Sequence, residues 1–230
     1  MVSGQLTMKS PPVQALRDLS LVAPVCLTEM VLIASPKVVE PSFLELLRSM
    51  KARPGEFKYA SYGMSSTNRL ILMDLFKAQG IEALHVPYNN GPQALADLIR
   101  GEVHMIFDTT QQTLPCIQAG QVMALAVGTP KRSPSPPDVP ILSELVRPGL
   151  EYAPFWGVAG PANLPADVTA RLVRELNGLL ADAEFVRKLE GLFMLPYAGD
   201  AAQAGRRDAA AIPGRDSGRR HRSDLKERAR

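Results

Sequence analysis

Short hydrophobic runs along this chain alternate with stretches in which hydrophobic residues recur every three or four positions. The runs at residues 30–34 (MVLIA), 82–87 (EALHVP), 103–108 (VHMIFD) and 123–129 (MALAVGT) have the length and density of buried strands. The stretches between them have the period of helices that bury one face. This alternation is typical of α/β proteins, so the pattern predicts a parallel sheet with helices on both faces.

Residues that start and stop helices fall where this pattern predicts helix ends. Ser42 and Glu45 have the spacing of a capping box, so we expect a helix to start there. Gly80 follows the next helical stretch, as suits a residue at a helix C-terminus. The first of these helices should bury a stripe of four residues, Phe43, Leu46, Leu47 and Met50.

Two more helices are predicted in the middle of the chain. One covers residues 92–100 and is followed by Gly101. The other begins at Asp108 or Thr109 and contains Pro115, which lacks a backbone donor. We therefore expect this second helix to kink or break at the proline.

The segments on either side of this region predict further strands. Residues 19–35 are apolar enough for two strands, with interruptions at Pro24 and at Thr28-Glu29. Residues 152–159 (YAPFWGVA) suit a further strand, which contains the only tryptophan. Phe155 and Trp156 in that strand either line a cleft or pack in the core.

The last third of the chain begins with helical patterns and then loses them. Residues 166–182 have the period of an amphipathic helix, and a short helix is predicted over residues 184–192. From residue 199 onward Ala, Gly, Arg and Asp dominate without any hydrophobic period, so nothing there specifies a fold.

The stretch FKYASYGMSSTN at residues 57–68 predicts a strand, a turn rich in hydroxyl groups and then a helix. The start of a helix directs unpaired N–H groups and the positive end of the helix dipole outward, which favours an anion. The candidate ligand-binding residues there are Ser61, Gly63, Ser65, Ser66, Thr67 and Asn68. The alternative is that they only cap their own helix. Arg69 is the nearest cation, and we expect it to face solvent.

Two more strand ends carry polar residues at the equivalent position. The first is followed by the candidates Tyr88, Asn89, Asn90 and Gly91, and the second ends at Asp108. Because parallel strands end at the same edge, three helix N-termini should share the rim where open α/β sheets bind ligands. The alternatives are that Asn-Asn-Gly is a turn in its own right and that Asp108 caps a helix rather than accepting from a ligand amine or hydroxyl.

Composition excludes several classes of protein. With 230 residues, 46% of them hydrophobic and 21% charged, the chain can build a core. The net charge of +3 comes from residues 206–230, where nine Lys and Arg face four acidic residues. A role in binding nucleic acid would rest on that basic tail alone, so we expect no nucleic-acid partner.

The two cysteines and the N-terminus give information on the cellular compartment of the chain. Cys26 and Cys116 are expected to be reduced packing residues, the alternative being one disulfide. No apolar run is long enough to span a membrane, and residues 1–18 lack the features of a signal peptide. As written, the chain would therefore stay in the cytoplasm.

Enzyme chemistry finds no support in the motifs. His85 and His104 lie inside predicted strands, His221 lies in the basic tail, and Cys116 has no histidine near it in sequence. No glycine-rich phosphate-binding motif is present. We therefore expect neither catalytic residues nor a metal site nor a cofactor.

Four segments together resemble a known family, the Bug or tripartite tricarboxylate transporter (TctC-like) extracytoplasmic solute-binding proteins. They begin with KARPGEFKYASYGMSSTNRL and HVPYNNGPQALADLIRGEVHMIFDTTQQTLPCIQAGQVMALAV, and continue with KRSPSPPDVPILSE and FWGVAGPANLPADVTARLVRELNGLL. They stand in the family's order and spacing and cover roughly residues 17–195.

The resemblance implies a type II periplasmic-binding-protein fold with two α/β lobes, one with a complete parallel sheet and one partial. It implies a non-enzymatic receptor for a small carboxylate (a di- or tricarboxylate, an amino acid or a related organic acid), working in the periplasm with membrane subunits of a tripartite uptake system. The domain boundaries it implies are 1–35 for a remnant of the first lobe and a crossing strand, 36–150 for the second lobe, 151–197 for a crossing strand and first-lobe helices, and 198–230 for a disordered tail.

The chain also departs from this family. Asn68 stands where members often have histidine, and Asn89 stands near the position of a frequent lysine. The secretory signal and the first strand of the family have no equivalent ahead of Leu16, and the tail after Ala198 lacks the family's C-terminal helix. The alternative to a functional receptor is therefore a truncated or frameshifted remnant that binds no ligand.

Overall fold

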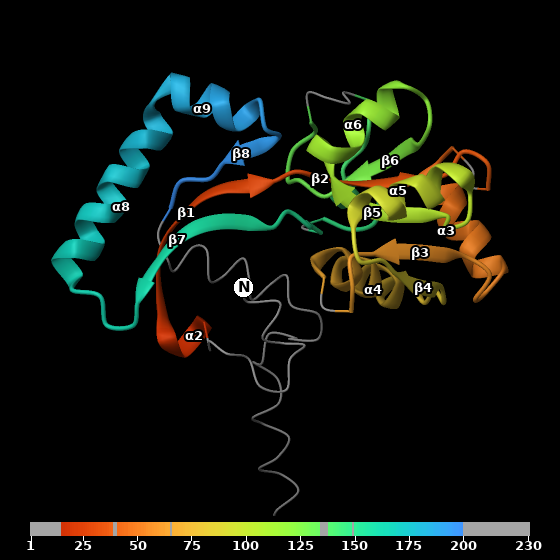
Figure 1. The fold of residues 1–230 in the computed structure, drawn as a ribbon, viewed down its shortest axis with the longest axis horizontal. Helices are drawn as coiled ribbons and strands as arrows, with labels where there is room; N and C mark the ends of the chain where they lie inside the picture. Colours follow the sequence, from red (N-terminus) through yellow and green to blue (C-terminus); the bar gives the residue numbers. More distant parts are fainter. Residues whose placement is uncertain (1–14, 39–40, 65, 134–137, 149, 200–230) are drawn as a thin grey trace, which may run out of the picture.

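The alternating side chains of the buried runs build two sheets. The computed structural model of the protein describes residues 15–38, 41–64, 66–133, 138–148 and 150–199. In chain order its elements are α2 (Ala15–Asp18), β1 (Leu19–Thr28), β2 (Met30–Ala34), α3 (Phe43–Ala52), β3 (Lys58–Ser61), α4 (Thr67–Gln79), β4 (Leu84–Pro87), α5 (Gly91–Arg100), β5 (Met105–Thr109), α6 (Thr110–Gln118), β6 (Met123–Val127), α7 (Leu142–Leu145), β7 (Phe155–Pro161), α8 (Ala166–Ala181), α9 (Ala183–Glu190) and β8 (Met194–Pro196). A larger sheet has the strand order β4-β3-β5-β2-β6, and a smaller sheet has the order β7-β1-β8 (Figure 1).

The larger sheet is mixed, because one of its strands runs against the others. β3 pairs in parallel with β4 and β5, whereas β2 is antiparallel to both β5 and β6. The prediction of an entirely parallel sheet is therefore wrong for β2. A strand buried on both faces has the same composition in either direction, so its sequence did not reveal which way it runs.

Both faces of the larger sheet are covered by helices. Met30, Leu32 and Ala34 on β2 point to a core shared with α3, α4 and α7. Val31 and Ile33 point to the opposite core, which contains residues of α5 and α6. All five residues of β2 are consequently buried, as their uninterrupted apolar run predicted.

The smaller sheet is built on β1, which pairs antiparallel with β7 on one side and with β8 on the other. Pro24 does not end β1. The pairing of β1 with β7 shifts register on either side of Pro24, and these irregularities accommodate the proline within the strand. Gly157 on β7 lies at this irregular point, and a Cβ built on it would lie 2.6 Å from the Ala23 carbonyl oxygen. The two strands therefore approach more closely there than a side chain would allow.

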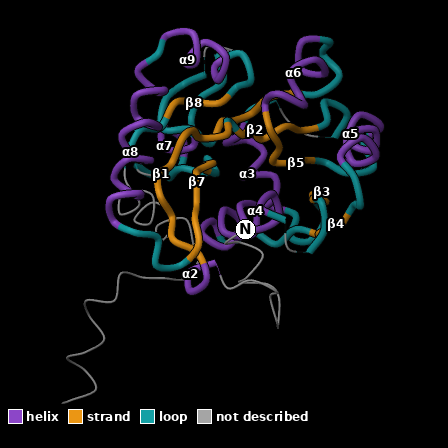
Figure 2. The backbone as a smooth tube through the Cα atoms, turned by 60° about the vertical axis from the view of Figure 1, so that its left-hand side comes forward, coloured by secondary structure: helices purple, strands orange, loops and turns teal. Residues whose placement is uncertain are grey.

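Two crossings of the chain connect the sheets. Glu29 is the single residue between β1 in the smaller sheet and β2 in the larger one. The chain returns to β7 beside it, and the Thr28 amide donates to the Pro154 carbonyl at 2.7 Å. β1 and β7 lie side by side in both ribbon and tube views (Figures 1 and 2).

Most predicted helix signals are confirmed, and two need correction. The stripe on α3 is buried, and Gly80 and Gly101 adopt left-handed conformations after α4 and α5. Ser42 is the N-cap residue of α3, but its side chain makes no capping hydrogen bond. Pro115 does not break α6, which continues to Gln118. The carbonyl that loses its donor belongs to Gln111, which is exposed and so accessible to water.

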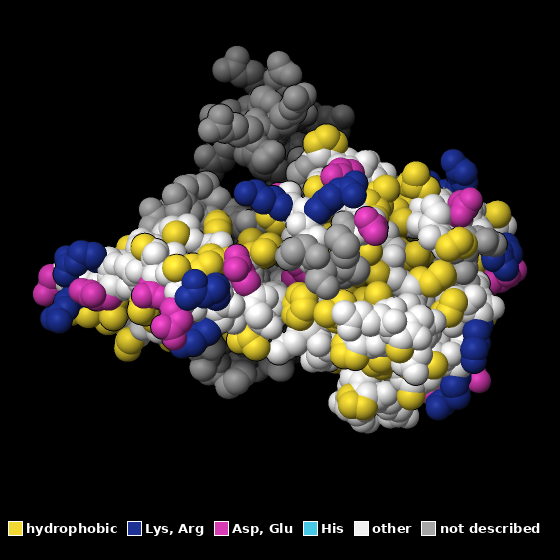
Figure 3. All heavy atoms as spheres, turned by 90° about the horizontal axis from the view of Figure 1, so that it is seen from above, with side chains coloured by type: hydrophobic (Ala, Val, Ile, Leu, Met, Phe, Trp, Pro, Cys, Tyr) yellow, Lys and Arg dark blue, Asp and Glu magenta, His cyan; other side chains and the backbone are white. Residues whose placement is uncertain are grey.

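The helices of the smaller sheet are much more exposed. α8 forms over the predicted range, yet none of its residues is buried. Val168, Leu172 and Leu179, from its apolar stripe, are 40%, 37% and 49% exposed. Seen from above, charged side chains stud the end of the molecule occupied by α8 and α9, with hydrophobic atoms between them (Figure 3).

The remaining predictions concern Trp156, the cysteines, membrane-spanning helices and the basic tail. Trp156 is 61% exposed, so of the two alternatives for it, packing in the core is excluded. Cys26 and Cys116 are free thiols, as expected. Within the described ranges no helix has the length and apolar character needed to cross a membrane. The expected basic tail lies outside the described residues.

Candidate functional site

The rim at the carboxyl ends of β3, β4 and β5 collects the predicted site residues. The three strands are parallel, so each ends at the same edge of the larger sheet. The helix after each strand begins at that edge, and these helices are α4, α5 and α6. Three helix N-termini therefore point toward the same rim, as the sequence predicted.

Gly91 is the point at which the three junctions meet. A Cβ built on Gly91 would lie 3.2 Å from the Tyr62 hydroxyl and 3.4 Å from Gln112 Oε1. Tyr62 belongs to the turn after β3, Gly91 begins α5, and Gln112 lies in the first turn of α6. The missing side chain of Gly91 lets these segments approach one another.

The turn after β3 is held by its own hydroxyl groups. Ser61 is 1% exposed, and its Oγ donates to the Gly63 carbonyl at 3.1 Å and lies 2.7 Å from His85 Nε2. Ser66 donates to the same carbonyl at 3.0 Å and accepts from the Arg69 amide at 3.4 Å as the N-cap of α4. These bonds support the capping interpretation, and contact with a ligand stays a prediction. Ser65 lies outside the described residues.

The first turn of α4 faces inward at Asn68. Its Nδ2 donates to the Phe107 carbonyl at 2.6 Å, and the residue is 9% exposed. Asn68 therefore ties α4 to β5 rather than presenting its amide to solvent. Thr67 is the first residue of α4 and is half-buried.

Asp108 is the most enclosed acidic group on the rim. It is 3% exposed, accepts a hydrogen bond from the Tyr62 hydroxyl and accepts another from the Thr109 amide at 2.7 Å. Burial raises the pKa of Asp108, while hydrogen bonds from Tyr62, Thr109 and Asn68 act to lower it. Burial also raises the pKa of Tyr62, and the neighbouring Asp108 raises it further. The hydrogen bond between Tyr62 and Asp108 therefore joins the turn after β3 to β5.

The junction after β4 is the most exposed of the three. Asn89 and Asn90 are exposed, and Asn90 Oδ1 caps α5 by accepting from the Gln93 amide at 3.0 Å. The Tyr88 hydroxyl donates to Asp97 Oδ2 at 2.7 Å. Burial, together with this bond to Asp97, raises the pKa of Tyr88 to about 12. Tyr88 thus remains protonated near neutral pH and fixes the start of α5.

Arg69 does not face solvent as expected. Its side chain is half-buried, and Nη1 donates to the Met64 carbonyl at 2.8 Å. The guanidinium lies close enough to Tyr59 and His85 to lower the pKa of both, although burial raises the pKa of Tyr59 more strongly. Burial itself is the larger cause of the lowered pKa of His85. Arg69 therefore stabilises the turn before α4 through its hydrogen bond to the Met64 carbonyl.

Sequence patterns missed three residues of the rim. Tyr62 and Gln112 contact Gly91, and the His85 ring lies against Ser61. Tyr62 lies inside the predicted turn, so its aromatic ring among small residues was an available signal. No local signal marked Gln112 or His85, because their contacts join segments far apart in sequence.

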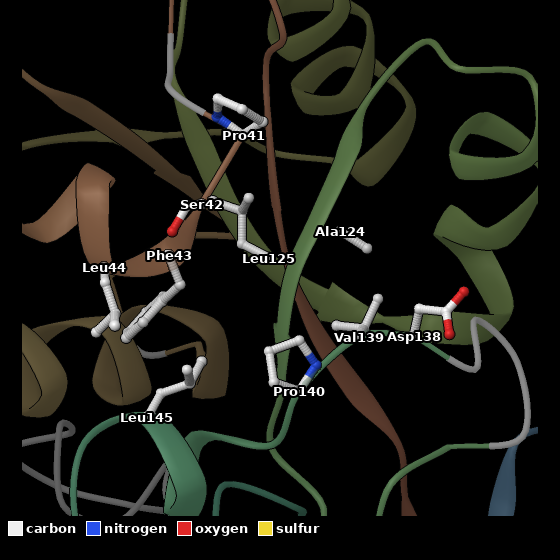
Figure 4. Close-up of a pocket in the computed structure, with 10 residues that line it drawn as sticks. All are labelled: Pro41, Ser42, Phe43, Leu44, Ala124, Leu125, Asp138, Val139, Pro140 and Leu145. Atoms are coloured by element: carbon white, nitrogen blue, oxygen red, sulfur yellow. The ribbon is translucent and has the colours of Figure 1, made fainter.

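A cavity of about 270 Å³ lies away from this rim. Figure 4 shows it between the start of α3 and the first half of β6, with Ser42, Leu125 and Pro140 among its lining residues. β6 runs parallel to β5, so the first half of β6 is at the edge opposite the rim. None of the predicted site residues lines this cavity. In the part of the chain that the structure describes, no cluster of His, Cys, Asp and Glu could hold a metal ion.

Comparison with known proteins places the chain in a family. A family model described as the tripartite tricarboxylate transporter family receptor matches residues 5–211. The chain belongs to this family. A UPF0065 protein of Bordetella bronchiseptica is 32% identical over 212 residues, which make up 92% of this chain and 61% of that protein. BugT of Bordetella pertussis is 32% identical over 178 residues, or 77% of this chain and 54% of BugT. The chain thus spans 54% to 61% of the length of these two relatives.

Several solved structures share the fold. Rpa4515 of R. palustris, solved with adipate, has a TM-score of 0.74 at 25% identity, covering 89% of this chain and 68% of that one. BugD, a periplasmic binding protein, has a TM-score of 0.67 at 26% identity, covering 84% and 67%. MatC of Rhodopseudomonas palustris with bound malate is 20% identical at a TM-score of 0.70, covering 91% and 72%, and it supports the fold alone. The predicted α/β fold of a periplasmic binding protein is confirmed.

Proposed function

We propose that this chain binds a small carboxylate at the rim where α4, α5 and α6 begin. The observation that carries the proposal is the meeting of three junctions at Gly91, beside Tyr62 and Gln112. A carboxylate leaving water needs fixed hydrogen-bond donors, and helix N-termini supply amide donors together with a favourable dipole. The Rpa4515 structure with adipate supports a dicarboxylate as the ligand class.

The start of α5 is the place where we expect a ligand carboxylate to bind. The first amides of α6 are already engaged, since Thr109 donates to Asp108 at 2.7 Å and Thr110 donates to the Glu29 carbonyl at 3.1 Å. In contrast, the junction before α5 is exposed at Asn89 and Asn90, and its N-cap bond engages the Gln93 amide. A ligand can therefore approach the α5 amides more closely than those of α6.

In the complete receptor, the two sheets would be the two lobes that close around the ligand. The division proposed is 36–150 for the second lobe, and 1–35 with 151–197 for the first lobe and its crossing strands, except that β2 at residues 30–34 lies in the larger sheet and so joins the second lobe. Membership of the family supports a periplasmic receptor that delivers its ligand to the membrane subunits of a tripartite transporter. Because the family is one of receptors, no catalytic step is proposed.

Calorimetric titration of the full chain with adipate and with malate tests this function. We expect heat of binding for the diacids and none for the uncharged dimethyl ester of adipate, because only an ionised carboxylate matches the helix N-termini. Asn90→Asp should weaken binding about tenfold, since it adds a like charge beside the ligand. Asp caps helices as well as Asn does, so the fold should be kept.

Ser42→Asp is the matched control, because it places the same charge at the N-cap of α3 on the opposite edge of the sheet. It should leave affinity unchanged. Equal losses in the two variants would argue against the rim as the site. Absence of any diacid binding by the full chain would favour the alternative that the chain binds no ligand on its own. The exposed apolar stripe of α8 also supports that alternative.

A further inference from the structure

Glu29 occupies an unusual position for an acidic residue. It is the one residue between β1 and β2, where the chain passes from the smaller sheet to the larger, and it is 2% exposed. Its amide donates to the Phe193 carbonyl at 3.1 Å, next to β8 in the smaller sheet. Its carbonyl accepts from the Thr110 amide at 3.1 Å, at the start of α6 on the larger sheet. The backbone of Glu29 is therefore hydrogen-bonded to a segment beside each of the two sheets.

The side chain of Glu29 is buried without full hydrogen bonding. Its Oε1 is enclosed and has no partner in the described residues, and the same is true of Thr110 Oγ1. The hydroxyls of Thr110 and Ser133 lie close enough to favour its charged form, although the Thr110 hydroxyl makes no full hydrogen bond with it. Burial outweighs them and raises the pKa of Glu29.

Charged groups that would stabilise an ionised Glu29 are missing from the elements around it. The sequences of β1, β2, α6, β7 and β8 contain no Lys, Arg, Asp or other Glu. The loop that carries Ser133 has Lys131 and Arg132, but both are exposed, and Arg132 pairs with Glu144 at 2.7 Å. The acidic group on the adjoining strand β5 is Asp108, which bonds to Tyr62 and Thr109 and would repel a second negative charge.

Two cysteines lie on the elements that surround Glu29, Cys26 on β1 and Cys116 on α6. Burial raises the pKa of Cys26, so this thiol stays neutral in the acid to neutral range. Neither cysteine supplies positive charge to Glu29. The carboxyl thus has two ways to avoid a buried unpaired charge: it can keep its proton, or the crossing can open and admit water.

We infer that Glu29 is a proton-controlled latch between the two sheets. Its neutral carboxyl keeps the crossing closed against α6 and the start of β8. Loss of the proton favours an open crossing, in which water reaches the carboxylate and the hydrogen bonds of Glu29 to Phe193 and Thr110 are released. The latch belongs to the crossing strand and operates without a ligand, so it does not depend on the carboxylate site at the rim.

The direction of the pH effect follows from the raised pKa of Glu29. Between the ordinary carboxyl pKa and the raised value, the closed form binds more protons than an open or unfolded form. The closed form is therefore favoured at low pH and loses stability as pH rises through that window. Each pH unit within the window changes the ratio of open to closed molecules by up to about tenfold, and above the raised pKa the ratio levels off.

Hydrogen exchange of the Glu29 and Thr110 amides, followed by NMR between about pH 4 and pH 8, tests the latch. After correction for intrinsic exchange, protection of both amides should fall up to about tenfold per pH unit and then level off. Protection of the Ile33 and Ile106 amides, which lie in paired core strands, should not follow this curve. Glu29→Gln, which mimics the protonated carboxyl, should abolish the pH dependence.

Glu45→Gln is the matched control, because it removes an exposed carboxyl from α3 and should leave exchange at the crossing unchanged. The same pH dependence in Glu29→Gln as in the unmodified chain would overturn the latch. Should Glu29→Gln fail to fold, titration of the Glu29 side-chain carbon in the unmodified, ¹³C-labelled chain decides instead. A midpoint above about 4.3 supports the latch, and a midpoint at or below that value overturns it.

Discussion

Leu72 and Leu172 are the same residue in similar helices, yet their surroundings differ completely. Leu72 on α4 is 0% exposed against the larger sheet, whereas Leu172 on α8 is 37% exposed beside the smaller one. Both belong to apolar stripes that predict an amphipathic helix. The pattern specified the helix in both cases, but burial required a second surface. The described residues provide that surface for α4 and not for α8.

The difference extends to the sheets that carry these helices. β2 at the centre of the larger sheet is buried at every residue and has helices on both faces. β7 at the edge of the smaller sheet is exposed or half-buried throughout. Stability in the part of the chain described here should therefore come mainly from the larger sheet, because hydrophobic burial is the dominant favourable contribution to folding.

The strongest test of this difference compares Leu72→Ala with Leu172→Ala in urea unfolding. Leu72→Ala should lower the free energy of unfolding by about 2–5 kcal/mol, because it leaves a cavity in a closed core. Leu172→Ala should cost about 1 kcal/mol or less, as is usual for a partly exposed position. Equal losses would show that the stripe of α8 is buried in solution, for instance against another molecule.

Gly157→Ala tests whether the smaller sheet is tightly formed despite its exposure. A Cβ at this position would meet the Ala23 carbonyl oxygen at 2.6 Å, so the strands must separate. We expect a loss of about 1–3 kcal/mol in the free energy of unfolding, typical of overpacking. Gly160→Ala on the same strand is the control, because its Cβ would meet only the flexible Leu164 side chain, at 3.2 Å. A neutral Gly157→Ala would mean that β1 and β7 are not closely paired.

Helix caps should contribute similarly in the two regions, because capping is local. Asp182 caps α9 by accepting from the Glu184 and Phe185 amides at 2.8 and 2.9 Å, and Ser66 caps α4. Replacing either by Ala should cost about 1 kcal/mol, measured by urea unfolding. Ser42→Ala is the control and should be nearly neutral, since Ser42 makes no side-chain capping bond. A neutral Asp182→Ala would indicate that α9 contributes nothing to the cooperative unit.

The smallest expected effect is a gain of stability in α8. Gly178 lies inside this helix, and a Cβ built on it would contact nothing within 4 Å. Gly178→Ala should therefore raise the free energy of unfolding by about 0.5–1 kcal/mol, because glycine loses more conformational freedom in a helix. Helicity by circular dichroism and the urea midpoint measure the change. A loss of stability would show that another surface already covers this position.

The sequence was informative wherever a feature depends on nearby residues. The buried stripe of α3 and the glycines after α4 and α5 were predicted because helix period and termination are encoded within a few positions. The direction of β2 and the exposure of Trp156 were not, because both depend on what lies across the fold.

The candidate site shows the same limit. The three strand ends could be placed on one rim from the alternation of strands and helices. The bond from Tyr62 to Asp108 and the contact of Gly91 with Gln112 could not, because these residues are brought together only by tertiary packing. Glu29 likewise looked like an interruption between strands, and only the packing of α6 shows that its carboxyl is enclosed.

Trp156 gives this chain a built-in optical reporter. It is the single tryptophan among 230 residues, and its indole Nε1 donates to Thr28 Oγ1, one residue before Glu29. Selective excitation of the indole therefore reads out the crossing between the sheets against a dark background from the rest of the protein. Emission wavelength and quenching by iodide could follow movement at the crossing in real time, without any attached dye.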